Sequence, residues 1–528
     1  MCGILFSNFQ NEPNSANEFV NALATMNHRG PDATGTWTDE KSVFLGHTRL
    51  SIQDLDVRSN QPFLSSDKKH LIIFNGEIYN FNELRKEFNI DTRTTSDTEV
   101  LLELYLLLGE KLLEHLNGMF AFVIYNKETK DIFAARDRLG IKPLYVFEDL
   151  EKIAFSSEIH ALKRIVPKAE FDIFGIRQYL KLRTFFNGNT LYKNIQMFPA
   201  GHYFKNGKTT RYWNIEDSSA RTEWNDEEIK YLVKDAVRLR RIADVPLGCY
   251  LSGGVDSTVI SGIAGETHTW TIGFPSQNEF EWGQLAAAAF ATTHHEIETD
   301  AAEFIDTAKD MIRKRDEPLS VPNEVLIKLM TLNVSKENTV VLSGEGADEL
   351  FWGYDRIFRW ANQGNWNLNE FDSLYSYGSH HDDEVLDSAL SPFAHIKSPL
   401  DKVASFMQIS HLHGLLRRLD NSTMACSVEA RVPFVDHRLV EYMYNAPFDF
   451  RMADSIVKAP LKRVFKELVP EEILNREKVG FPVPLKEIFS SSNASGMDSW
   501  LDFNMEILVG ENWAEFKNDL LNDIAKSH

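Results

Sequence analysis

Residues 247–264 read LGCYLSGGVDSTVISGIA: a short apolar run, a glycine-rich turn, and a second run whose apolar spacing is compatible with a helix. A strand that leads through such a turn into a helix points backbone N–H groups and the positive end of the helix dipole at one place. The stretch therefore predicts an anion site at the end of a buried strand. The alternative is a plain glycine-rich turn with no ligand.

Two more short apolar runs follow, at residues 269–274 and 339–342, and helical patterns separate them. Strands that alternate with helices predict a parallel sheet. From about residue 393 the sequence is mostly helical in pattern. We therefore expect an α/β domain with a parallel sheet and a helical carboxyl-terminal part.

The glycine-rich turn does not match two common nucleotide-binding motifs. The chain contains no GxxxxGK[ST] sequence, and the nearest spacing, at residues 201–209, is one residue too long. It also contains no GxGxxG sequence, so nothing supports dinucleotide binding.

The first third of the chain has a different pattern. Short apolar runs at residues 71–74, 120–125 and 131–135 are typical of buried strands, and residues 201–213 suit a hairpin that turns at Asn206-Gly207. Residues 97–108 predict a buried helix. Its start fits a capping box, with Ser96 at the N-cap and Glu99 three residues later. These features predict an α+β domain.

Length and charge limit the possible classes. A chain of 528 residues suggests two or three domains, and the polar residues 214–228 are the expected linker. The sum of 56 Lys+Arg and 77 Asp+Glu gives a net charge of −21. A surface with this much negative charge repels phosphate backbones and anionic lipids. We therefore expect neither nucleic acid nor membrane as a partner.

The three cysteines are too few and too widely spaced for a disulfide framework. No stretch approaches the roughly 20 apolar residues that span a bilayer, and the amino terminus lacks the basic region of a secretory signal. We therefore expect a cytoplasmic protein.

Cys2 becomes the first residue if Met1 is removed. A free α-amino group has a pKa of about 7.7–8.0 and can take the proton of its own thiol, which makes Cys2 a candidate nucleophile. The alternative is a small buried cysteine with no chemistry.

Five motifs accompany Cys2. They are Asn27-His-Arg-Gly-Pro-Asp32, Gly46-His-Thr-Arg-Leu-Ser-Ile52, Asn75-Gly-Glu-Ile-Tyr-Asn80, Ser96-Asp-Thr-Glu99 and Arg136-Asp-Arg-Leu-Gly-Ile-Lys-Pro143. Their order resembles the class II glutamine amidotransferase domain, which has an N-terminal-nucleophile hydrolase fold of stacked antiparallel sheets between helices. The resemblance covers about residues 2–200, and we expect the domain over residues 2–210.

This resemblance implies that Cys2 is the nucleophile and that Asn75 and Gly76 form the oxyanion hole. It places the glutamine pocket at Arg49, Leu50, Ser51, Ile52, Gln53, Asn75, Gly76, Glu77 and Asp97. The chemistry agrees, because cleavage of an amide needs donors aimed at the developing oxyanion. A guanidinium suits the α-carboxylate of glutamine and carboxylates suit its ammonium. Taken alone, Asn75-Gly76 is equally compatible with a hairpin turn, and Asp97 with a helix-capping role.

Residues 252–257 resemble the pyrophosphate loop of ATP pyrophosphatases. Residues 342–351, 427–436 and 458–463 resemble the synthetase domain of asparagine synthetase. This second resemblance runs over about residues 230–490, and we expect the domain over residues 225–528. Together the two resemblances identify the chain as similar to the glutamine-hydrolysing asparagine synthetase family.

The second resemblance also assigns roles. Lys458 corresponds to a lysine that contacts the α-phosphate, and Glu345 to a glutamate that handles the incoming ammonia. Asp256 and Asp348 are the expected Mg²⁺ ligands, and Asp348 and Arg431 are expected around the intermediate together with Glu345. The residues expected at ATP and its pyrophosphate are Tyr250, Ser252, Gly253, Gly254, Val255, Asp256, Ser257, Ile272, Ser343, Gly344 and Lys458. Tyr250 replaces a leucine common in the family, which leaves a backbone contact intact.

The implied enzyme is a carbon–nitrogen ligase of asparagine biosynthesis with ATP and Mg²⁺ as cofactors. It would convert aspartate to asparagine through an acyl-AMP intermediate, with glutamine as nitrogen donor and AMP and pyrophosphate as products. The alternative acceptor is another carboxylate, such as a sugar uronate or a secondary-metabolite acid. A non-catalytic sensor of ammonia or nucleotide is a further alternative. The oligomeric state stays open, a homodimer included.

Overall fold

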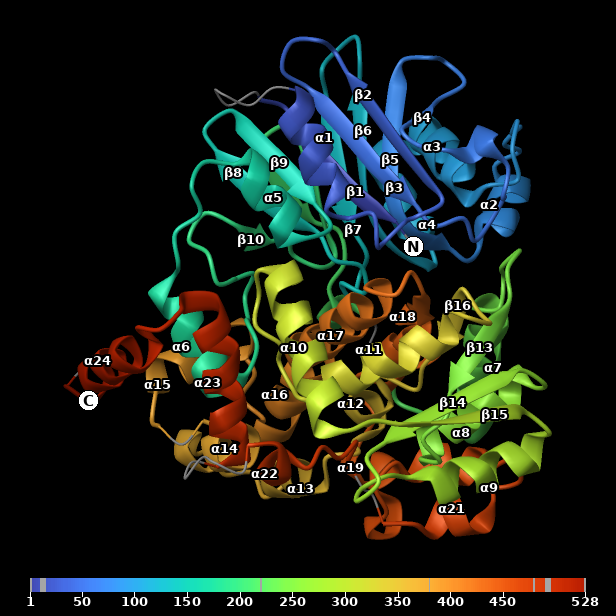
Figure 1. Cartoon of the computed structure of the whole chain (residues 1–528). Coiled ribbons are helices and arrows are strands. Elements are labelled where there is room, and N and C mark those ends of the chain that lie inside the picture. The colour runs from blue at the N-terminus through green and yellow to red at the C-terminus, as the bar shows by residue number, and fades with distance from the viewer. Residues whose placement is uncertain are drawn as a thin grey trace.

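The computed structural model describes residues 2–9, 16–218, 221–378, 380–477, 480–489 and 495–526. Met1, the assumed leaving residue, lies outside these ranges, as do Ser219 and Ala220 of the expected linker. Figure 1 shows the amino-terminal sheets in the upper half of the molecule and the parallel sheet in the lower half.

The upper half contains two six-stranded antiparallel sheets. Their strand orders are β10-β8-β9-β1-β3-β2 and β12-β11-β7-β6-β5-β4. The strands are β1 (Gly3–Ser7), β2 (Ala33–Thr38), β3 (Phe44–Arg49), β4 (Phe63–Leu64), β5 (His70–Ile78), β6 (Gly118–Asn126), β7 (Ile132–Arg136), β8 (Tyr145–Asp149), β9 (Lys152–Ser156), β10 (Gln196–Met197), β11 (His202–Lys205) and β12 (Lys208–Arg211).

Apolar side chains hold these layers together. Residues such as Ile4, Phe6, Ile73 and Val123 pack between the two sheets. Helices α1 (Ala16–Ala24) and α5 (Ile159–Ile165) cover the first sheet. Helices α2 (Phe81–Glu87), α3 (Asp97–Leu108) and α4 (Leu112–His115) share a core with the second sheet. Two sheets stacked between helices confirm the predicted amino-terminal fold.

Local predictions in this half are mostly confirmed. The three apolar runs form parts of β5, β6 and β7, and the Asn206-Gly207 turn joins β11 to β12. Ser96 caps α3 by accepting a hydrogen bond from the Thr98 N–H. The capping box is wrong in its second half, however: the Glu99 carboxylate accepts from the backbone N–H groups of Arg93 and Thr94 instead of that of Ser96.

The lower half is built on a five-stranded parallel sheet of order β15-β14-β13-β16-β17. These strands are β13 (Leu247–Tyr250), β14 (His268–Gly273), β15 (Thr293–Glu298), β16 (Val340–Leu342) and β17 (Glu429–Arg431). The order reverses between β13 and β16, and ligands of open α/β sheets bind at the carboxyl ends of strands at such a point. The parallel sheet and the helical remainder confirm the predicted α/β domain.

Helices make up most of the rest of the lower half. They are α7 (Asp226–Leu239), α8 (Val255–Ala264), α9 (Phe280–Phe290), α10 (Ala301–Arg315), α11 (Asn323–Val334), α12 (Ala347–Phe351), α13 (Asp355–Ala361), α14 (Leu368–Tyr375), α15 (Asp383–Leu390), α16 (Pro399–Phe406), α17 (Leu412–Met424), α18 (His437–Met443), α19 (Phe448–Arg451), α20 (Ala459–Val464), α21 (Glu471–Asn475), α22 (Leu485–Ile488), α23 (Gly496–Val509) and α24 (Trp513–Lys526).

Helix α6 (Ile173–Leu182) belongs by sequence to the amino-terminal part, yet it lies in the lower half beside α15 (Figure 1). The Arg177 guanidinium contacts both carboxylate oxygens of Asp382 at 2.9 and 2.7 Å. The Tyr179 hydroxyl donates to the Leu319 carbonyl at 2.9 Å. The chain between α5 and β10 therefore enters the lower half, and these contacts fix α6 there.

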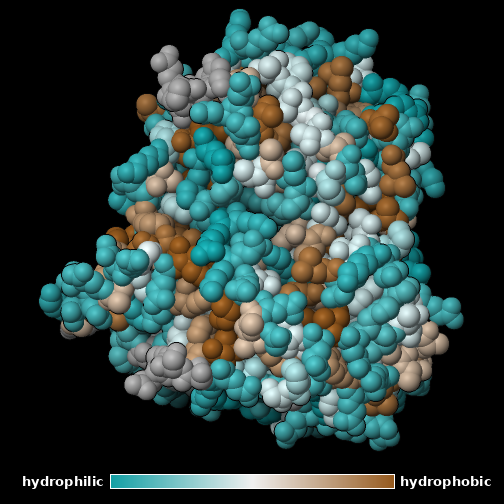
Figure 2. Space-filling model, in the orientation of Figure 1, coloured by the Kyte–Doolittle hydropathy of each residue, from teal (hydrophilic) through white to brown (hydrophobic). Residues whose placement is uncertain are grey.

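Polar residues cover most of the visible surface, and apolar residues form smaller patches on it (Figure 2). Among the residues that the structure describes, no helix is both long and apolar enough to cross a bilayer.

Candidate active sites

Cys2 is the residue before β1, and both its N–H and its carbonyl form hydrogen bonds. Its N–H donates to Asn75 Oδ1 at 3.0 Å, and its carbonyl accepts from Arg29 Nε at 3.1 Å. Burial raises the pKa of the Cys2 thiol, and a hydrogen bond from the Leu50 backbone and the charge of Arg49 act in the opposite direction. The thiol therefore lies in a largely dry site with nearby groups that favour the thiolate.

Asn75 and Gly76 both lie inside β5, which excludes the hairpin-turn alternative. Asn75 is completely buried, and its Nδ2 has no hydrogen-bond partner within the described residues. A Cβ at Gly76 would lie 2.1 Å from the Met119 carbonyl oxygen, so no other residue fits there. A buried amide donor without a partner beside a thiol is what a developing oxyanion requires.

Arg49 has a different environment from the one that sequence reasoning expected. Its guanidinium donates to the carbonyls of Asp54 and Asp56 and to the Asn60 side chain. In this structure the N–H donors of the Arg49 guanidinium are thus used by residues 54–60, the loop that follows residues 50–53. Residues 50–53 themselves are held from the other direction, because the Ser51 N–H donates to Asp32 Oδ2 at 2.7 Å.

The acidic groups of the predicted glutamine pocket form one buried cluster. Gln53 donates from its side-chain amide to Glu77, and Arg431 of the lower half lies 3.5 Å from the same carboxylate. Burial, together with the charges of Glu429 and Asp97, raises the pKa of Glu77. Burial raises the pKa of Asp97 to about 6, although the Ile78 N–H donates to it. One more positive charge would therefore be stabilised here, as the ammonium of glutamine would be.

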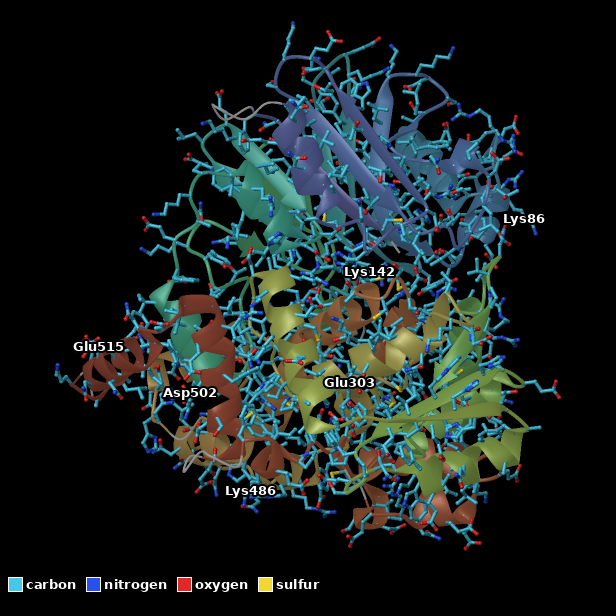
Figure 3. All side chains as sticks on the ribbon, viewed as in Figure 1. Lys86, Lys142, Glu303, Lys486, Asp502 and Glu515 are labelled. Carbon is cyan, nitrogen blue, oxygen red and sulfur yellow. The ribbon has the colours of Figure 1, made fainter. Side chains whose placement is uncertain are left out.

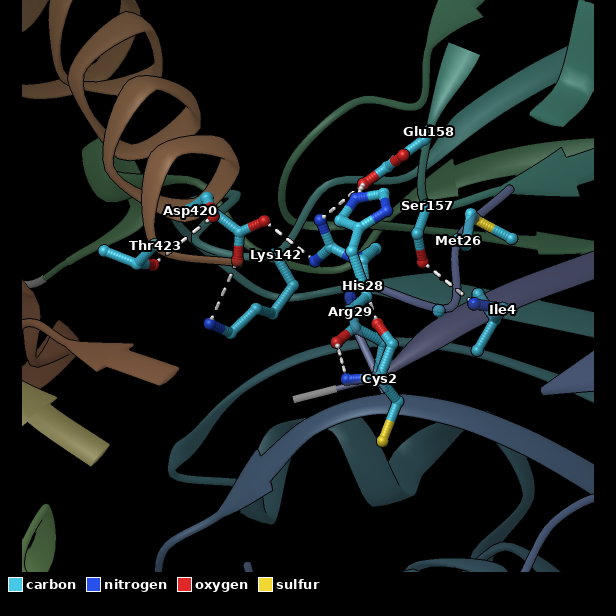
Figure 4. A network of polar contacts seen from close by, with 12 residues as sticks. Cys2, Ile4, Met26, His28, Arg29, Lys142, Ser157, Glu158, Asp420 and Thr423 are labelled. Carbon is cyan, nitrogen blue, oxygen red and sulfur yellow. Dashed lines mark hydrogen bonds and ion pairs between the residues drawn. The ribbon is translucent and has the colours of Figure 1, made fainter. Parts of the chain in front are cut away.

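A second buried network joins the nucleophile to the lower half (Figure 4). The guanidinium of Arg29, completely buried, contacts Glu158 at 3.2 Å and Asp420 of α17 at 2.8 Å. Lys142 Nζ lies 3.4 Å from Asp420, and Figure 3 shows Lys142 at the boundary between the halves. Sequence reasoning quoted the motifs that contain Arg29 and Lys142 but gave neither a role, because their partner Asp420 is distant in sequence.

The second candidate site is a cavity of about 710 Å³ at the carboxyl ends of β13 and β16. Its walls include most of the residues that the sequence assigns to ATP and the acceptor: Tyr250, Ser252, Gly254, Val255, Asp256, Ser257, Ile272, Ser343, Gly344, Glu345, Asp348 and Lys458. Gly253 is not part of the wall. It has a φ of +72°, and a Cβ there would lie 2.3 Å from the Trp282 backbone, so it makes the turn that shapes the loop.

The loop after β13 leads directly into α8, whose N-cap Gly254 provides no side-chain cap. The first N–H groups of a helix have no partner inside the helix, so an uncapped start can bind an oxyanion. This is the geometry that residues 252–257 predicted.

Lys458 joins the two sides of the cavity. Its Nζ lies 2.5 Å from Asp256 of α8 and 2.6 Å from Asp348 of α12. Burial alone would lower the pKa of Lys458, but the two carboxylates outweigh it and the pKa is raised. Two carboxylates that converge on one cation also suit Mg²⁺, which typically takes one or two of them together with phosphate oxygens.

Glu345, the residue expected to handle ammonia, is held by a group that sequence reasoning missed. Arg418 of α17 contacts both of its carboxylate oxygens, at 2.9 and 2.8 Å. Arg431 does not line the cavity but lies completely buried at the boundary with Glu77 and Glu429. The guanidinium of Arg431 instead donates to the backbone carbonyls of Arg240 and Ile242, at 2.9 and 2.7 Å, and these contacts hold it at the boundary.

Comparisons with known proteins agree over most of the chain. The family model described as a glutamine amidotransferase domain matches residues 1–213, and the one described as asparagine synthase matches residues 228–501. Asparagine synthetase [glutamine-hydrolyzing] 3 of Bacillus subtilis is 30% identical, across 95% of this chain and 89% of that relative. Asparagine synthetase B [glutamine-hydrolyzing] of Escherichia coli is 28% identical, across 86% of this chain and 77% of that relative. The chain therefore belongs to the glutamine-hydrolysing asparagine synthetase family and is a ligase with a glutamine amidotransferase domain.

Proposed function

We propose that the enzyme transfers the amide nitrogen of glutamine to the side-chain carboxylate of aspartate, at the expense of ATP. The observation that carries this proposal is the pairing of Lys458 with Asp256 of the pyrophosphate loop and with Asp348, in a cavity that also contains Glu345. Membership of the family implies the use of ATP.

In the amino-terminal site, the Cys2 thiolate attacks the glutamine carboxamide and forms a tetrahedral intermediate. The unpartnered Asn75 Nδ2 and the Gly76 backbone donate to its oxyanion. Ammonia leaves, and water hydrolyses the remaining glutamyl thioester. Glu77 and Asp97 attract the ammonium of glutamine. Arg49 binds the α-carboxylate of glutamine only after it gives up some of its hydrogen bonds to residues 54–60.

In the cavity, an oxygen of the acceptor carboxylate attacks the α-phosphorus of ATP, and pyrophosphate leaves toward residues 252–257. Lys458 stabilises the negative charge that develops at the α-phosphate. Asp256 and Asp348 would hold Mg²⁺, which neutralises phosphate charge when it is bound. Ammonia then attacks the acyl carbon of the adenylate and AMP leaves, with Glu345 placed to take a proton.

Ammonia that escapes into water at neutral pH becomes protonated and loses its nucleophilicity, so the route between the sites must exclude water. The experiment that tests the proposal places ¹⁵N in the side chain of glutamine and follows the label by mass spectrometry. Labelled amide product with one AMP and one pyrophosphate per event is expected. ADP in place of AMP, or unlabelled product, would contradict the proposal.

The matched variant is Cys2→Ala. It should abolish glutamine-dependent synthesis and leave synthesis from ammonium chloride measurable, because the cavity does not contain Cys2. Loss of both activities in a folded sample would rule out two separate sites. Absence of glutamine hydrolysis in the processed wild-type protein would instead favour the non-catalytic sensor.

A further inference from the structure

The cavity has an end that the ATP-binding residues do not reach. Its wall there is formed by the last residue of α6 and the two that follow it, by His411 and the start of α17, and by three tyrosines. These wall residues are Leu182, Arg183, Thr184, Tyr354, Tyr375, Tyr377, His411 and Gly414.

Arg183 is the basic residue of this end. Its guanidinium carbon lies 3.6 Å from the ring centroid of Tyr377, and burial lowers the pKa of Arg183. Within the described ranges, no carboxylate forms an ion pair with Arg183, whereas the cavity residues Arg418 and Lys458 both have carboxylate partners.

The buried acid beside these tyrosines has other partners. Glu349 accepts a hydrogen bond from the Tyr354 hydroxyl at 2.5 Å, and its carboxylate lies 3.8 Å from His411 Nε2. Among the described residues, no ion pair joins Glu349 to Arg183. A half-buried cation without a counter-ion has lost part of its hydration, and an anionic ligand would offset that cost.

The position of Arg183 is fixed in advance. It follows α6 with a φ of +65°, and its N–H closes the helix on the Tyr179 carbonyl. Besides the Arg177–Asp382 pair, Lys181 Nζ lies 2.8 Å from Asp372. A helix held at several points presents its last side chain to the cavity without a large entropic cost on binding.

Residues 183–184 and the group that holds Glu345 lie along the same helix, α17. A Cβ at Gly414 would lie 3.2 Å from Thr184 Oγ1, so Thr184 packs at that point of the helix. Arg418, which holds Glu345, is four residues further on the same face. Four residues correspond to a rise of about 6 Å, so the two points are about one helical turn apart.

We propose that Arg183 binds a second anionic group of the acceptor. The acceptor then carries one carboxylate that is activated and a separate acid that anchors it. This inference rests on the proposed function and names the substrate class of the same cavity. A guanidinium binds carboxylate or phosphate through two parallel hydrogen bonds. The second acid is therefore the α-carboxylate of a dicarboxylic amino acid or a phosphate attached to a sugar uronate.

The experiment measures pyrophosphate release with Mg·ATP and ammonium chloride, so that the glutamine site is not needed. One arm compares aspartate with β-alanine, which is aspartate without its α-carboxylate. The other arm compares UDP-glucuronate with glucuronate, which lacks the phosphates. In one arm, kcat/KM of the wild type should be about 100-fold higher for the compound with the second acid. That arm identifies the source of the anion.

Arg183→Gln should raise the KM for the accepted compound about 100-fold and leave the KM for ATP and the glutaminase rate within twofold. Arg183→Lys should have a KM for the accepted compound between those of the wild type and Arg183→Gln. Lysine keeps the positive charge but lacks the two parallel N–H donors of the guanidinium. The matched control is Arg356→Gln, an exposed arginine on α13 outside the cavity wall, which should change nothing.

An unchanged acceptor KM in Arg183→Gln would overturn the inference, as would equal use of both compounds in the active arm. A parallel rise in the KM for ATP would also overturn it, because that result indicates a structural role. Failure of every compound to release pyrophosphate from wild type that still hydrolyses glutamine would instead refute the synthetase half of the proposed function.

Discussion

The two candidate sites differ in how their charged groups are neutralised. Around Cys2, the buried cations Arg29 and Arg431 are paired within the protein before any substrate binds. In the cavity Lys458 is shared between two carboxylates, and Arg183 has no carboxylate partner among the described residues. The site at Cys2 thus neutralises its cations within the protein and leaves buried carboxylates for the ammonium of glutamine, whereas the cavity leaves the cation Arg183 for an anionic group.

The sharpest way to break this comparison is Lys458→Met. Asp256 and Asp348 would then face each other without a cation, and the charge at the α-phosphate would lose its partner. We expect kcat for synthesis to fall about 10³-fold with glutaminase activity intact. Pyrophosphate release and glutamate formation, measured on the same sample, separate the two. An equal loss of both activities would mean that the sites are not distinct.

Asn75→Asp tests the opposite site. The carboxylate keeps the acceptor for the Cys2 N–H and removes the Nδ2 donor. The kcat for glutamine hydrolysis should fall about 10²-fold, with little change in the KM for glutamine. Ammonium-dependent synthesis on the same preparation is the control. A rise in KM without a change in kcat would assign Asn75 to substrate binding instead.

The pH dependence sharpens the comparison further. The pKa of Asp97 is raised to about 6, so Asp97 loses its negative charge as the pH falls through that value. The KM for glutamine should then rise by about tenfold per pH unit below 6, because the charged ligand for the ammonium is lost. In Asp97→Asn the step near pH 6 should disappear, and any dependence that remains belongs to Glu77, whose pKa is also raised. Because the pKa of Asp97 is higher in the folded than in the unfolded state, its contribution to the free energy of unfolding is largest at low pH. That contribution is lost as the pH rises through about 6.

The smallest effect is expected from Tyr250→Phe in the cavity wall. The Tyr250 hydroxyl contacts Thr331 Oγ1 at 2.6 Å, away from the pyrophosphate loop. Loss of this buried hydrogen bond should lower the free energy of unfolding by about 1 kcal/mol. The KM for ATP should stay within twofold of wild type, since the predicted contact of Tyr250 is through its backbone. Denaturant unfolding and ATP kinetics measure the two quantities.

The sequence predicted groups that lie in recognisable motifs. The strand, turn and helix at residues 247–264 form one such stretch, and Asn75 was predicted although its partner Cys2 is 73 residues away. Arg418 and Arg183 were missed because both lie outside the quoted motifs, so that only the folded chain shows what surrounds them. Glu99 was assigned to the wrong N–H groups for a different reason, since a long side chain can reach several donors in a loop.

Helix α17 carries one further consequence. Arg418 holds Glu345 in the cavity, and Asp420, two residues later, holds Arg29, which supports the Cys2 carbonyl. Sliding this helix by a single residue, about 1.5 Å, would stretch both ion pairs at once. One helix thus contacts both candidate sites, so a displacement of α17 would change the surroundings of Glu345 and of the Cys2 carbonyl together.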